Sequence, residues 1–246
     1  MKKAFTTHIV SFILGVAITL TTVYLISDTK AEPTPEPTPI VIEKEVVKEI
    51  PVEVVKEVIK EVEKKTDLEE VVANCKNSCV MIYAYKGDII NQGSGWVYNG
   101  YVITAKHVVD GYKKIEVYTD DTDNPRTATI EYIDTNLDMA ILKAPIALPS
   151  LTLGDSNKLT EGEKLVSITS PMMTKNAIDE CVYSGTVRTP EGTFLVITES
   201  NMGGGSSGGA VLDYNSKIIG MVKSGDSGGH HVIRINDIKP ILENLK

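Results

Sequence analysis

Cysteine is scarce in this chain of 246 residues, which contains only Cys75, Cys79 and Cys181. Three scattered cysteines are too few for the disulfide framework that holds many small secreted domains together. The chain also lacks the paired His and Cys clusters of a zinc site. We therefore expect small buried apolar residues at these positions, with a disulfide or a reactive thiol as the alternative.

Positive charge is in deficit, with 25 Lys and Arg against 33 Asp and Glu and a net charge of -8 at pH 7. A protein that neutralises nucleic-acid phosphates needs the opposite balance, so nucleic acids and other polyanions are not expected partners. The length is sufficient for a large core in one or two domains.

Charged side chains are absent from His8 to Ile26. At about 1.5 Å per residue, a helix over 8–26 comes close to the ~30 Å hydrocarbon core of a bilayer. The segment is long for a signal-peptide core, typically about 7 to 15 residues, and the triplet 29–31 is a poor cleavage site. We expect an uncleaved transmembrane anchor with residues 1–7 in the cytoplasm and the remainder outside it. Cleavage would instead produce a secreted protein.

Residues 27–66 lack the pattern of a packed core. Proline alternates with polar residues over 32–39, which predicts an extended polyproline spacer. Glu and an apolar residue then recur every four positions over 45–62, so an apolar stripe winds around a helix instead of forming one seam. Pro51 interrupts the repeat. We expect a solvated, partly helical stalk that can self-associate, with a true coiled coil as the alternative.

From residue 67 onward the sequence has the pattern of apolar runs and turn residues that is typical of a folded domain. A short helix over 68–73 precedes many short β-rich runs, and turn signals such as Asn99-Gly100 separate them. An amphipathic helix over 235–246 ends the chain. This pattern predicts an all-β sandwich or barrel, and the strand count does not choose between them. The expected strands are 79–85, 94–98, 101–104, 114–118, 128–133, 139–143, 164–169, 182–188, 193–199, 210–213, 217–223 and 231–235.

Glycine is concentrated around Ser207, in the stretch Gly-Gly-Gly-Ser-Ser-Gly-Gly-Ala of residues 203–210. Glycines let the backbone turn tightly and leave no side chains in front of the serine. Its hydroxyl can then reach a substrate carbonyl, which makes Ser207 a candidate nucleophile. If Ser206 were the nucleophile, the paired glycines at 208–209 would not directly follow it.

A serine nucleophile needs a base and a group that orients the base. The chain has only four histidines, and His107 ends a β-rich run. Asp138 begins an apolar strand, so its carboxylate is free to leave the core. Asp134 competes for the same role but is equally suited to capping a turn. The order along the chain is His, Asp, Ser.

Four motifs resemble the trypsin-like serine proteases of the HtrA/Deg type: Gly-Ser-Gly-Trp at 93–96, Thr-Ala-Lys-His-Val-Val at 104–109, Asp-Met-Ala-Ile-Leu at 138–142, and Ser-Ser-Gly-Gly-Ala at 206–210. The resemblance covers about residue 68 to the end. It implies a protease domain over 67–246 built from two six-stranded antiparallel β-barrels, about 75–150 and about 151–246. The active site would lie in the cleft between them.

The resemblance implies a serine endopeptidase that acts on protein or peptide substrates through His107, Asp138 and Ser207. His107 would act as the base, Asp138 would orient it, and Ser207 would attack. Backbone N–H groups of Gly205, Ser206 and Ser207 would form the oxyanion hole. This chemistry requires no cofactor and no metal. Trimers are common in the resembled family, so a homotrimer is implied by analogy alone.

A second serine, Ser227, lies in Gly-Asp-Ser-Gly-Gly at 225–229, with His230 and His231 directly after it. We favour Ser207, because a strand, a turn and a second strand ending near Gly220 follow it as they do in the family. Too few residues follow Ser227 to complete a barrel. We interpret residues 225–229 as a flexible loop at the rim of the substrate pocket.

Some features depart from the family pattern: Ser206 stands where Asn is usual, and no sequence follows the terminal helix for a PDZ domain. Substrate capture through such a domain is therefore not expected. A small or apolar residue at the cleavage position would fit the family, whereas Lys223 would attract an acidic one. The predicted substrate pocket comprises Asn201, Ile219, Gly220, Met221, Val222 and Lys223.

Two other classes of function compete with the protease. A proteolytically inactive relative could use the same cleft to bind peptides, although such a protein has no chemical reason to keep His107, Asp138 and Ser207 together. A non-enzymatic adhesin or stalk protein is the third hypothesis.

Overall fold

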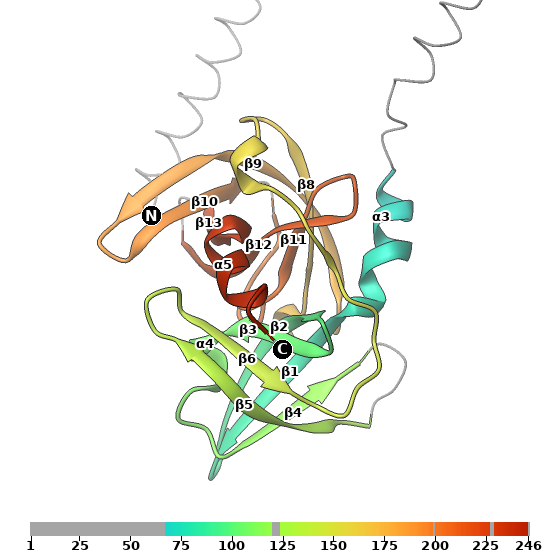
Figure 1. The fold of residues 1–246 in the computed structure, drawn as a ribbon, viewed down its shortest axis with the longest axis vertical. Coiled ribbons are helices and arrows are strands. Elements are labelled where there is room, and N and C mark those ends of the chain that lie inside the picture. Colours follow the sequence, from blue (N-terminus) through green and yellow to red (C-terminus); the bar gives the residue numbers. More distant parts are fainter. Residues whose placement is uncertain (1–66, 120–123, 199, 227–228, 246) are drawn as a thin grey trace, which may run out of the picture. The chain divides into compact units, whose positions relative to one another are not determined.

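The computed structural model describes residues 67–119, 124–198, 200–226 and 229–245. The predicted anchor at 8–26 and the spacer and stalk at 27–66 lie outside these residues. Within the described part, no helix has the length and apolar character needed to cross a membrane. The described part is all-β with short helices at its edges (Figure 1).

The first barrel is a closed antiparallel sheet with the strand order β1-β2-β3-β6-β5-β4. Its interior is filled by large apolar side chains that have lost all contact with solvent, among them Trp96, Ile103 and Ile141. Its strands are β1 (Cys79–Lys86), β2 (Ile89–Tyr98), β3 (Tyr101–Ala105), β4 (Lys114–Tyr118), β5 (Arg126–Asp134) and β6 (Met139–Lys143).

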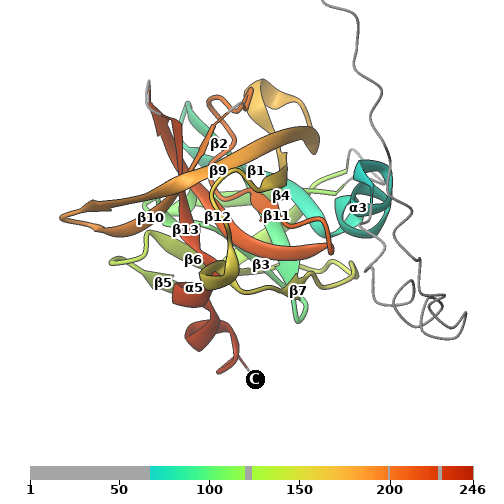
Figure 2. The same ribbon diagram turned by 90° about the horizontal axis from the view of Figure 1, so that it is seen from above.

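The second sheet has the order β11-β8-β9-β10-β13-β12-β7, and an additional β11–β12 pairing closes six of these strands into a barrel. The two-residue strand β7 is added outside the ring, parallel to β12. Figure 2 shows the β9–β10 hairpin projecting beyond the rest of this barrel. The strands are β7 (Thr152–Leu153), β8 (Lys164–Thr169), β9 (Ala177–Thr189), β10 (Gly192–Thr198), β11 (Ala210–Leu212), β12 (Lys217–Asp226) and β13 (Gly229–Arg234).

The prediction of two six-stranded antiparallel barrels followed by a helix is confirmed. Strand β7 was missed, because two residues are too few to carry a detectable alternation. The segment 225–229 was expected to be a loop, but β12 continues through Asp226 and β13 begins at Gly229. Only 227–228 remain between the strands, and they lie outside the described residues.

Three helices flank the barrels. Helix α3 (Leu68–Cys75) begins after Asp67, whose carboxylate accepts a hydrogen bond from the Glu70 N–H at 2.9 Å and so caps the helix. Helix α4 (Lys106–Val109) directly follows β3 and was not predicted, since four residues show no helical period. Helix α5 (Ile235–Leu242) ends before the predicted residue 246. Short 3₁₀ turns span Lys76–Ser78, Ser156–Lys158 and Pro171–Met173.

A single apolar cluster joins the two barrels. Ile82 and Val102 of the first barrel belong to the same cluster as Ile168 and Leu212 of the second, and α5 contributes Ile238. Burying an aliphatic side chain of this size contributes about 1.5 to 3 kcal/mol. The shared core holds the two barrels together, and so fixes the position of residues in one barrel relative to residues in the other.

The three cysteines are buried, and no disulfide links them within the described residues. Burial raises the pKa of the Cys181 thiol to about 12, with further raising from Asp179 and Glu180. A thiol of that pKa is protonated and unreactive near neutral pH. The interpretation of the cysteines as small buried residues is therefore confirmed.

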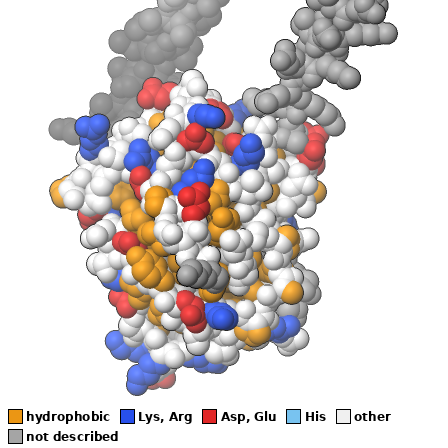
Figure 3. Space-filling view, viewed as in Figure 1, with side chains coloured by type: hydrophobic (Ala, Val, Ile, Leu, Met, Phe, Trp, Pro, Cys, Tyr) orange, Lys and Arg blue, Asp and Glu red, His pale blue; other side chains and the backbone are white. Residues whose placement is uncertain are grey.

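Acidic and basic side chains alternate over the face drawn in Figure 3, with apolar side chains between them. On this face the described residues form no continuous basic surface.

Candidate active site

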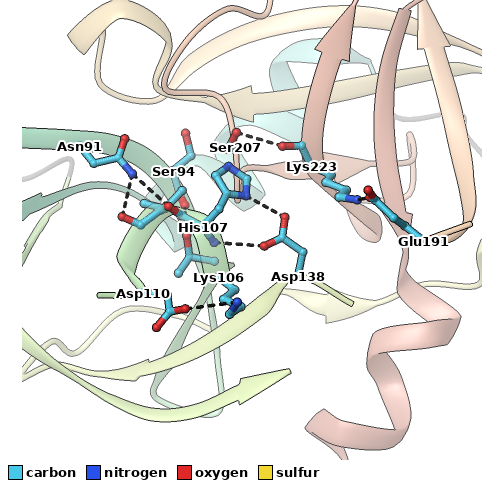
Figure 4. Close-up of polar contacts among 11 residues, drawn as sticks. Asn91, Ser94, Lys106, His107, Asp110, Asp138, Glu191, Ser207 and Lys223 are labelled. Carbon is cyan, nitrogen blue, oxygen red and sulfur yellow. Dashed lines mark hydrogen bonds and ion pairs between the residues drawn. The ribbon is translucent and has the colours of Figure 1, made fainter. Parts of the chain in front are cut away.

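Asp138 holds both the backbone and the imidazole of His107. Its Oδ2 lies 2.7 Å from His107 Nδ1, and its Oδ1 accepts a hydrogen bond from the His107 N–H at 3.1 Å (Figure 4). Its carbonyl oxygen accepts a further bond from the Lys106 N–H at 2.9 Å. Asp138 has a φ of 54°, a left-handed conformation that Asp tolerates better than most residues. The turn before β6 therefore aims the carboxylate at α4.

The environment of Asp138 keeps its carboxyl group ionised. Burial alone would raise the pKa, because it removes the carboxylate from water. The hydrogen bonds from His107 and its electrostatic attraction outweigh burial, and Lys223 adds a smaller effect of the same sign, so the pKa of Asp138 lies below its usual value. An ionised carboxylate at Nδ1 fixes the imidazole with its proton on Nδ1 and leaves Nε2 free to accept one.

The competing carboxylate, Asp134, has a different role. Its Oδ1 accepts hydrogen bonds from the N–H groups of Asn136 at 2.9 Å and Leu137 at 3.0 Å. Asp134 therefore caps the turn between β5 and β6, and Asp138 is the residue that contacts His107.

Asn91 supports His107 from β2. Its side-chain amide donates to the carbonyl oxygens of His107 at 3.1 Å and Val108 at 3.0 Å. These carbonyls belong to a four-residue helix that is too short to satisfy them internally. The His107 side chain remains 46% exposed against 20% for Asp138, so a substrate can reach the imidazole. The sequence carried no signal for this role of Asn91.

Ser207 lies beside the imidazole of His107, on a turn of the second barrel (Figure 4). Its Oγ donates a hydrogen bond to the carbonyl oxygen of Lys223 at 3.0 Å. Within the described residues, no hydrogen bond connects this hydroxyl to His107. The three residues are brought together, but the serine hydroxyl is directed toward β12.

The turn before Ser207 orients its peptide groups through their carbonyl oxygens. The Gly204 carbonyl accepts a hydrogen bond from the Met172 N–H at 2.8 Å. In a trans peptide the N–H points opposite to the carbonyl, so the Gly205 N–H is directed away from Met172. Gly205 has a φ of 98°, a region open to glycine, and its α-carbon lies against the side-chain amide of Gln92.

The predicted oxyanion residues differ in what their N–H groups do. The Ser206 N–H donates to the Gly203 carbonyl at 3.0 Å and is used within the turn. The N–H groups of Gly205 and Ser207 have no hydrogen-bond partner among the described residues. The structure therefore separates Gly205 and Ser207, which are available to a ligand, from Ser206, which is not.

Ser94 ties this turn to the first barrel. Its N–H donates to the Ser207 carbonyl at 2.8 Å, and its Oγ donates to the Gly205 carbonyl at 2.7 Å. The same Oγ accepts a hydrogen bond from the Ser170 N–H at 2.7 Å. Ser94 is only 1% exposed, so these bonds are shielded from water. The sequence marked Ser94 as part of a motif but did not indicate that it contacts the turn.

A cavity of about 520 Å³ opens beside Ser207. Its lining residues come from the turn before Ser207, from β12 and from β13. They are Met202, Gly203, Gly204, Ser206, Ser207, Val222, Ser224, Gly225 and His230.

Of the predicted pocket residues, only Val222 lines this cavity. Gly220 and Met221 pair with β11 and β13 inside the barrel. The register of β12 against β13 shifts between Val222 and Ser224, at Lys223. The Lys223 side chain does not line the cavity: its ammonium pairs with Glu191 and lies 4.5 Å from the centroid of the Phe194 ring.

The remaining two predicted pocket residues also lie outside the cavity lining. Ile219 lines a separate cavity, and the Asn201 N–H donates to Asp179. The lining residues that the sequence did not indicate include Ser224 and His230. Their positions depend on the pairing of β12 with β13.

Within the described part of the chain, no group of three or more His, Cys, Asp or Glu side chains is arranged to hold a metal ion.

A family model and curated proteins that match this chain all belong to serine peptidases. Residues 93–221 match the trypsin-like peptidase domain. The chain is 33% identical over 135 residues to a probable periplasmic serine endoprotease DegP-like of Halomonas elongata, a match that covers 52% of this chain and 28% of that protein. It is 31% identical over 199 residues to the mitochondrial serine protease HTRA2 of Drosophila pseudoobscura pseudoobscura, covering 72% and 46% respectively. The chain thus spans less than half the length of these curated relatives.

Solved structures share the fold. The HtrA-type protease AlgW with a tripeptide is similar at a TM-score of 0.66 and 25% identity, over 72% of this chain and 62% of that one. The active form of the Rv3671c protease from M. tuberculosis is similar at a TM-score of 0.64 and 24% identity, over 73% of this chain and 87% of that one.

Proposed function

The chain belongs to the trypsin-like serine proteases of the HtrA type, and on this premise we propose that it is a serine endopeptidase that uses His107, Asp138 and Ser207. The observation that carries the proposal is the pair formed by His107 and Asp138 at 2.7 Å, beside a serine in a glycine-framed turn. Each of the four motifs that resemble the family contributes a residue to this site, including Ser94, which is hydrogen-bonded to Ser207.

The proposed reaction begins with rotation of the Ser207 side chain. Its Oγ leaves the Lys223 carbonyl and donates to Nε2 of His107, which takes the proton as Oγ attacks the peptide carbonyl. His107 then transfers the proton to the leaving amine, and an acyl-enzyme remains. Water activated by His107 hydrolyses the ester. Throughout, Asp138 accepts the Nδ1–H and stabilises the imidazolium.

We assign the oxyanion hole to the N–H groups of Gly205 and Ser207. Neither N–H group has a hydrogen-bond partner among the described residues, and the carbonyls of the turn are bonded elsewhere. The two donors are therefore preorganised to stabilise a developing negative charge. Losing one such donor typically costs about 2.7 to 4 kcal/mol of transition-state stabilisation. Ser206 contributes to the turn and not to the hole, because the Gly203 carbonyl already accepts its N–H.

We also propose that residues 8–26 anchor the protein in a membrane and that residues 27–66 hold the peptidase domain away from it, outside the cytoplasm. Protein or peptide segments would be the substrates, and a homo-oligomer, a trimer by analogy, is the proposed assembly. Protease protection of right-side-out and inverted vesicles tests the topology. Recovery of the intact chain in the soluble fraction contradicts the anchor.

One observation favours a second function, a proteolytically inactive scaffold that binds peptides in the same cleft. The Ser207 hydroxyl is bonded to the Lys223 carbonyl and not to His107. A serine that stays in this position is not activated by the imidazole.

A fluorophosphonate probe, which reacts with activated serines, distinguishes the two functions. We expect the full chain to be labelled, Ser207→Ala to lose the label, and the matched control Ser227→Ala to keep it. The same pattern is expected for hydrolysis of a fluorescent unfolded protein. Labelling that survives in Ser207→Ala and disappears in Ser227→Ala would move the nucleophile to Ser227. Peptide binding with neither labelling nor hydrolysis would favour the scaffold.

A further inference from the structure

We infer that the proposed peptidase prefers an acidic side chain before the cleaved bond, and that His230 recognises its carboxylate in the cavity beside Ser207. The inference rests on the proposed function, since it concerns the same site. Ser207 and the turn before it form one wall of the cavity. The side chain of the residue whose carbonyl Ser207 attacks is therefore the one that this cavity receives.

The lining of the cavity contains few polar groups that are free to bind a ligand. Met202 and Val222 are apolar, and several further positions are glycines. The Ser206 hydroxyl is already used, since it accepts from the Gly203 N–H at 3.2 Å and donates to Thr169 at 3.3 Å. Among the described residues, the side chains of Ser224 and His230 have no hydrogen-bond partner. These two groups are therefore available to a substrate.

The backbone of β12 fixes the position of His230. His230 pairs with Gly225 across the β12–β13 ladder, and a Cβ at position 225 would overlap Nδ1 of the imidazole. The ring therefore packs directly on the strand at a position where only glycine leaves room for it. The ring is held at the cavity wall by this packing.

The neighbouring histidine belongs to a different environment. Successive side chains of a strand point to opposite faces, and the His231 ring stacks on Phe194 with centroids 6.0 Å apart and an interplanar angle of 11°. His231 does not line the cavity. One histidine of the pair is thus available for recognition, and the other provides a matched control.

The charges around the cavity favour a carboxylate. His230 is the only titratable side chain in the described lining, which contains no Asp, Glu, Lys or Arg. Around the ring, β10 presents the apolar Ile197 opposite His230, and the nearest cation of β12, Lys223, is paired with Glu191. A carboxylate would accept a charge-assisted hydrogen bond from the imidazolium and a second bond from Ser224. A basic side chain would find no acidic partner in this lining.

The test compares two fluorogenic peptides that differ only in Glu or Gln before the cleaved bond, with the full chain as enzyme. We expect kcat/KM for the Glu peptide to exceed that for the Gln peptide roughly 10- to 100-fold at about pH 6. The ratio should fall as the pH rises, because a neutral imidazole donates a weaker hydrogen bond to a carboxylate than an imidazolium does. Because both peptides are cleaved by the same triad, any effect of pH on the triad cancels in the ratio.

The His230→Gln variant should bring the Glu-to-Gln ratio close to one and make it independent of pH. The His231→Gln variant should keep both the ratio and its pH dependence. Fluorophosphonate labelling of Ser207 shows that each variant is folded and chemically competent, and the His231→Gln control should be labelled at the wild-type rate.

Several outcomes would overturn the inference. A His230→Gln variant that keeps the preference for Glu would exclude His230 as the residue that recognises the substrate carboxylate. Faster cleavage of matched Val or Lys peptides than of the Glu peptide at about pH 6 would exclude an acidic preference. A wild-type chain that reacts with the probe but shows no Glu preference contradicts this inference alone. A chain that neither reacts with the probe nor cleaves any peptide contradicts the proposed function as well.

Discussion

The hydroxyl of Ser207 donates to the carbonyl oxygen of Lys223 at 3.0 Å, although the side chain lies beside His107. The two residues that a serine peptidase couples are therefore adjacent but not hydrogen-bonded within the described part of the chain. A rotation about the Ser207 Cα–Cβ bond would exchange one acceptor for the other. Staggered rotamers of an accessible serine interconvert rapidly, so the barrier to this exchange is small.

The first prediction follows from this rotation. In a crystal structure of the phosphonate adduct, we expect Ser207 Oγ to have left the Lys223 carbonyl and the phosphoryl oxygen to lie within hydrogen-bonding distance of the Gly205 and Ser207 N–H groups. A phosphoryl oxygen bound by any other pair of donors would refute our assignment of the oxyanion hole.

The second prediction concerns the carboxylate that orients His107. Asp138→Asn keeps the size of the side chain but removes the charge that stabilises the imidazolium, and it can hold the wrong tautomer. Known triads lose about 10⁴-fold in kcat after this change. We expect a loss of similar order in peptide hydrolysis. Asp134→Asn is the matched control, because that carboxylate caps a turn; its activity should stay within a few-fold of wild type.

The third prediction links Asp138 to stability in acid. Its pKa is lower in the folded protein than in the unfolded chain, so the group stabilises the fold above its unfolded pKa of about 3.9. This stabilisation is lost as the pH falls through the lower folded pKa. Urea unfolding between pH 6 and pH 2 should show that Asp138→Asn loses less stability on acidification than wild type. Equal losses would mean that Asp138 titrates normally.

The fourth prediction concerns Ser94 as a positioning residue. Ser94→Ala leaves the Gly205 carbonyl and the Ser170 N–H without their partner, at a cost of roughly 1 to 3 kcal/mol for such buried groups. We expect kcat to fall at least tenfold with little change in KM, together with weaker binding of a peptide boronate that mimics the tetrahedral intermediate.

Ser78→Ala is the matched control for that experiment. Ser78 is also 1% exposed, but its hydroxyl has no hydrogen-bond partner in the described structure. Its removal should alter neither kcat nor boronate affinity. Equal effects of the two substitutions would show that Ser94 acts only through general stability.

The fifth prediction concerns the thiols. Burial raises the pKa of Cys181 to about 12 and also raises that of Cys75. Native protein should therefore react with no more than a trace of iodoacetamide at pH 7, whereas protein unfolded in guanidinium without reductant should react at Cys75, Cys79 and Cys181. Fewer than three reactive thiols after unfolding would indicate a disulfide.

Much of the architecture could be read from local patterns. The strands 114–118, 139–143 and 164–169 were predicted with the bounds that the structure has, because each is a short apolar run between clear turn signals. The motifs around His107, Asp138 and Ser207 indicated which residues would meet. The bounds of β2 and β9 were less accurate, since both strands extend through polar residues whose pairing depends on neighbouring strands.

Alternating hydrophobicity and turn residues are properties of neighbours in the chain, and for that reason the amino-acid order was enough to specify an all-β fold and its candidate triad. Contacts between distant segments required folding. Ser94 and Gly205 are separated by 111 positions, yet their hydrogen bond orients the turn before the nucleophile. The register of β12 against β13 turned Lys223 toward Glu191 and placed His230 in the cavity. Packing of the two barrels decided these positions, because no local pattern records which side chains meet across a shared core.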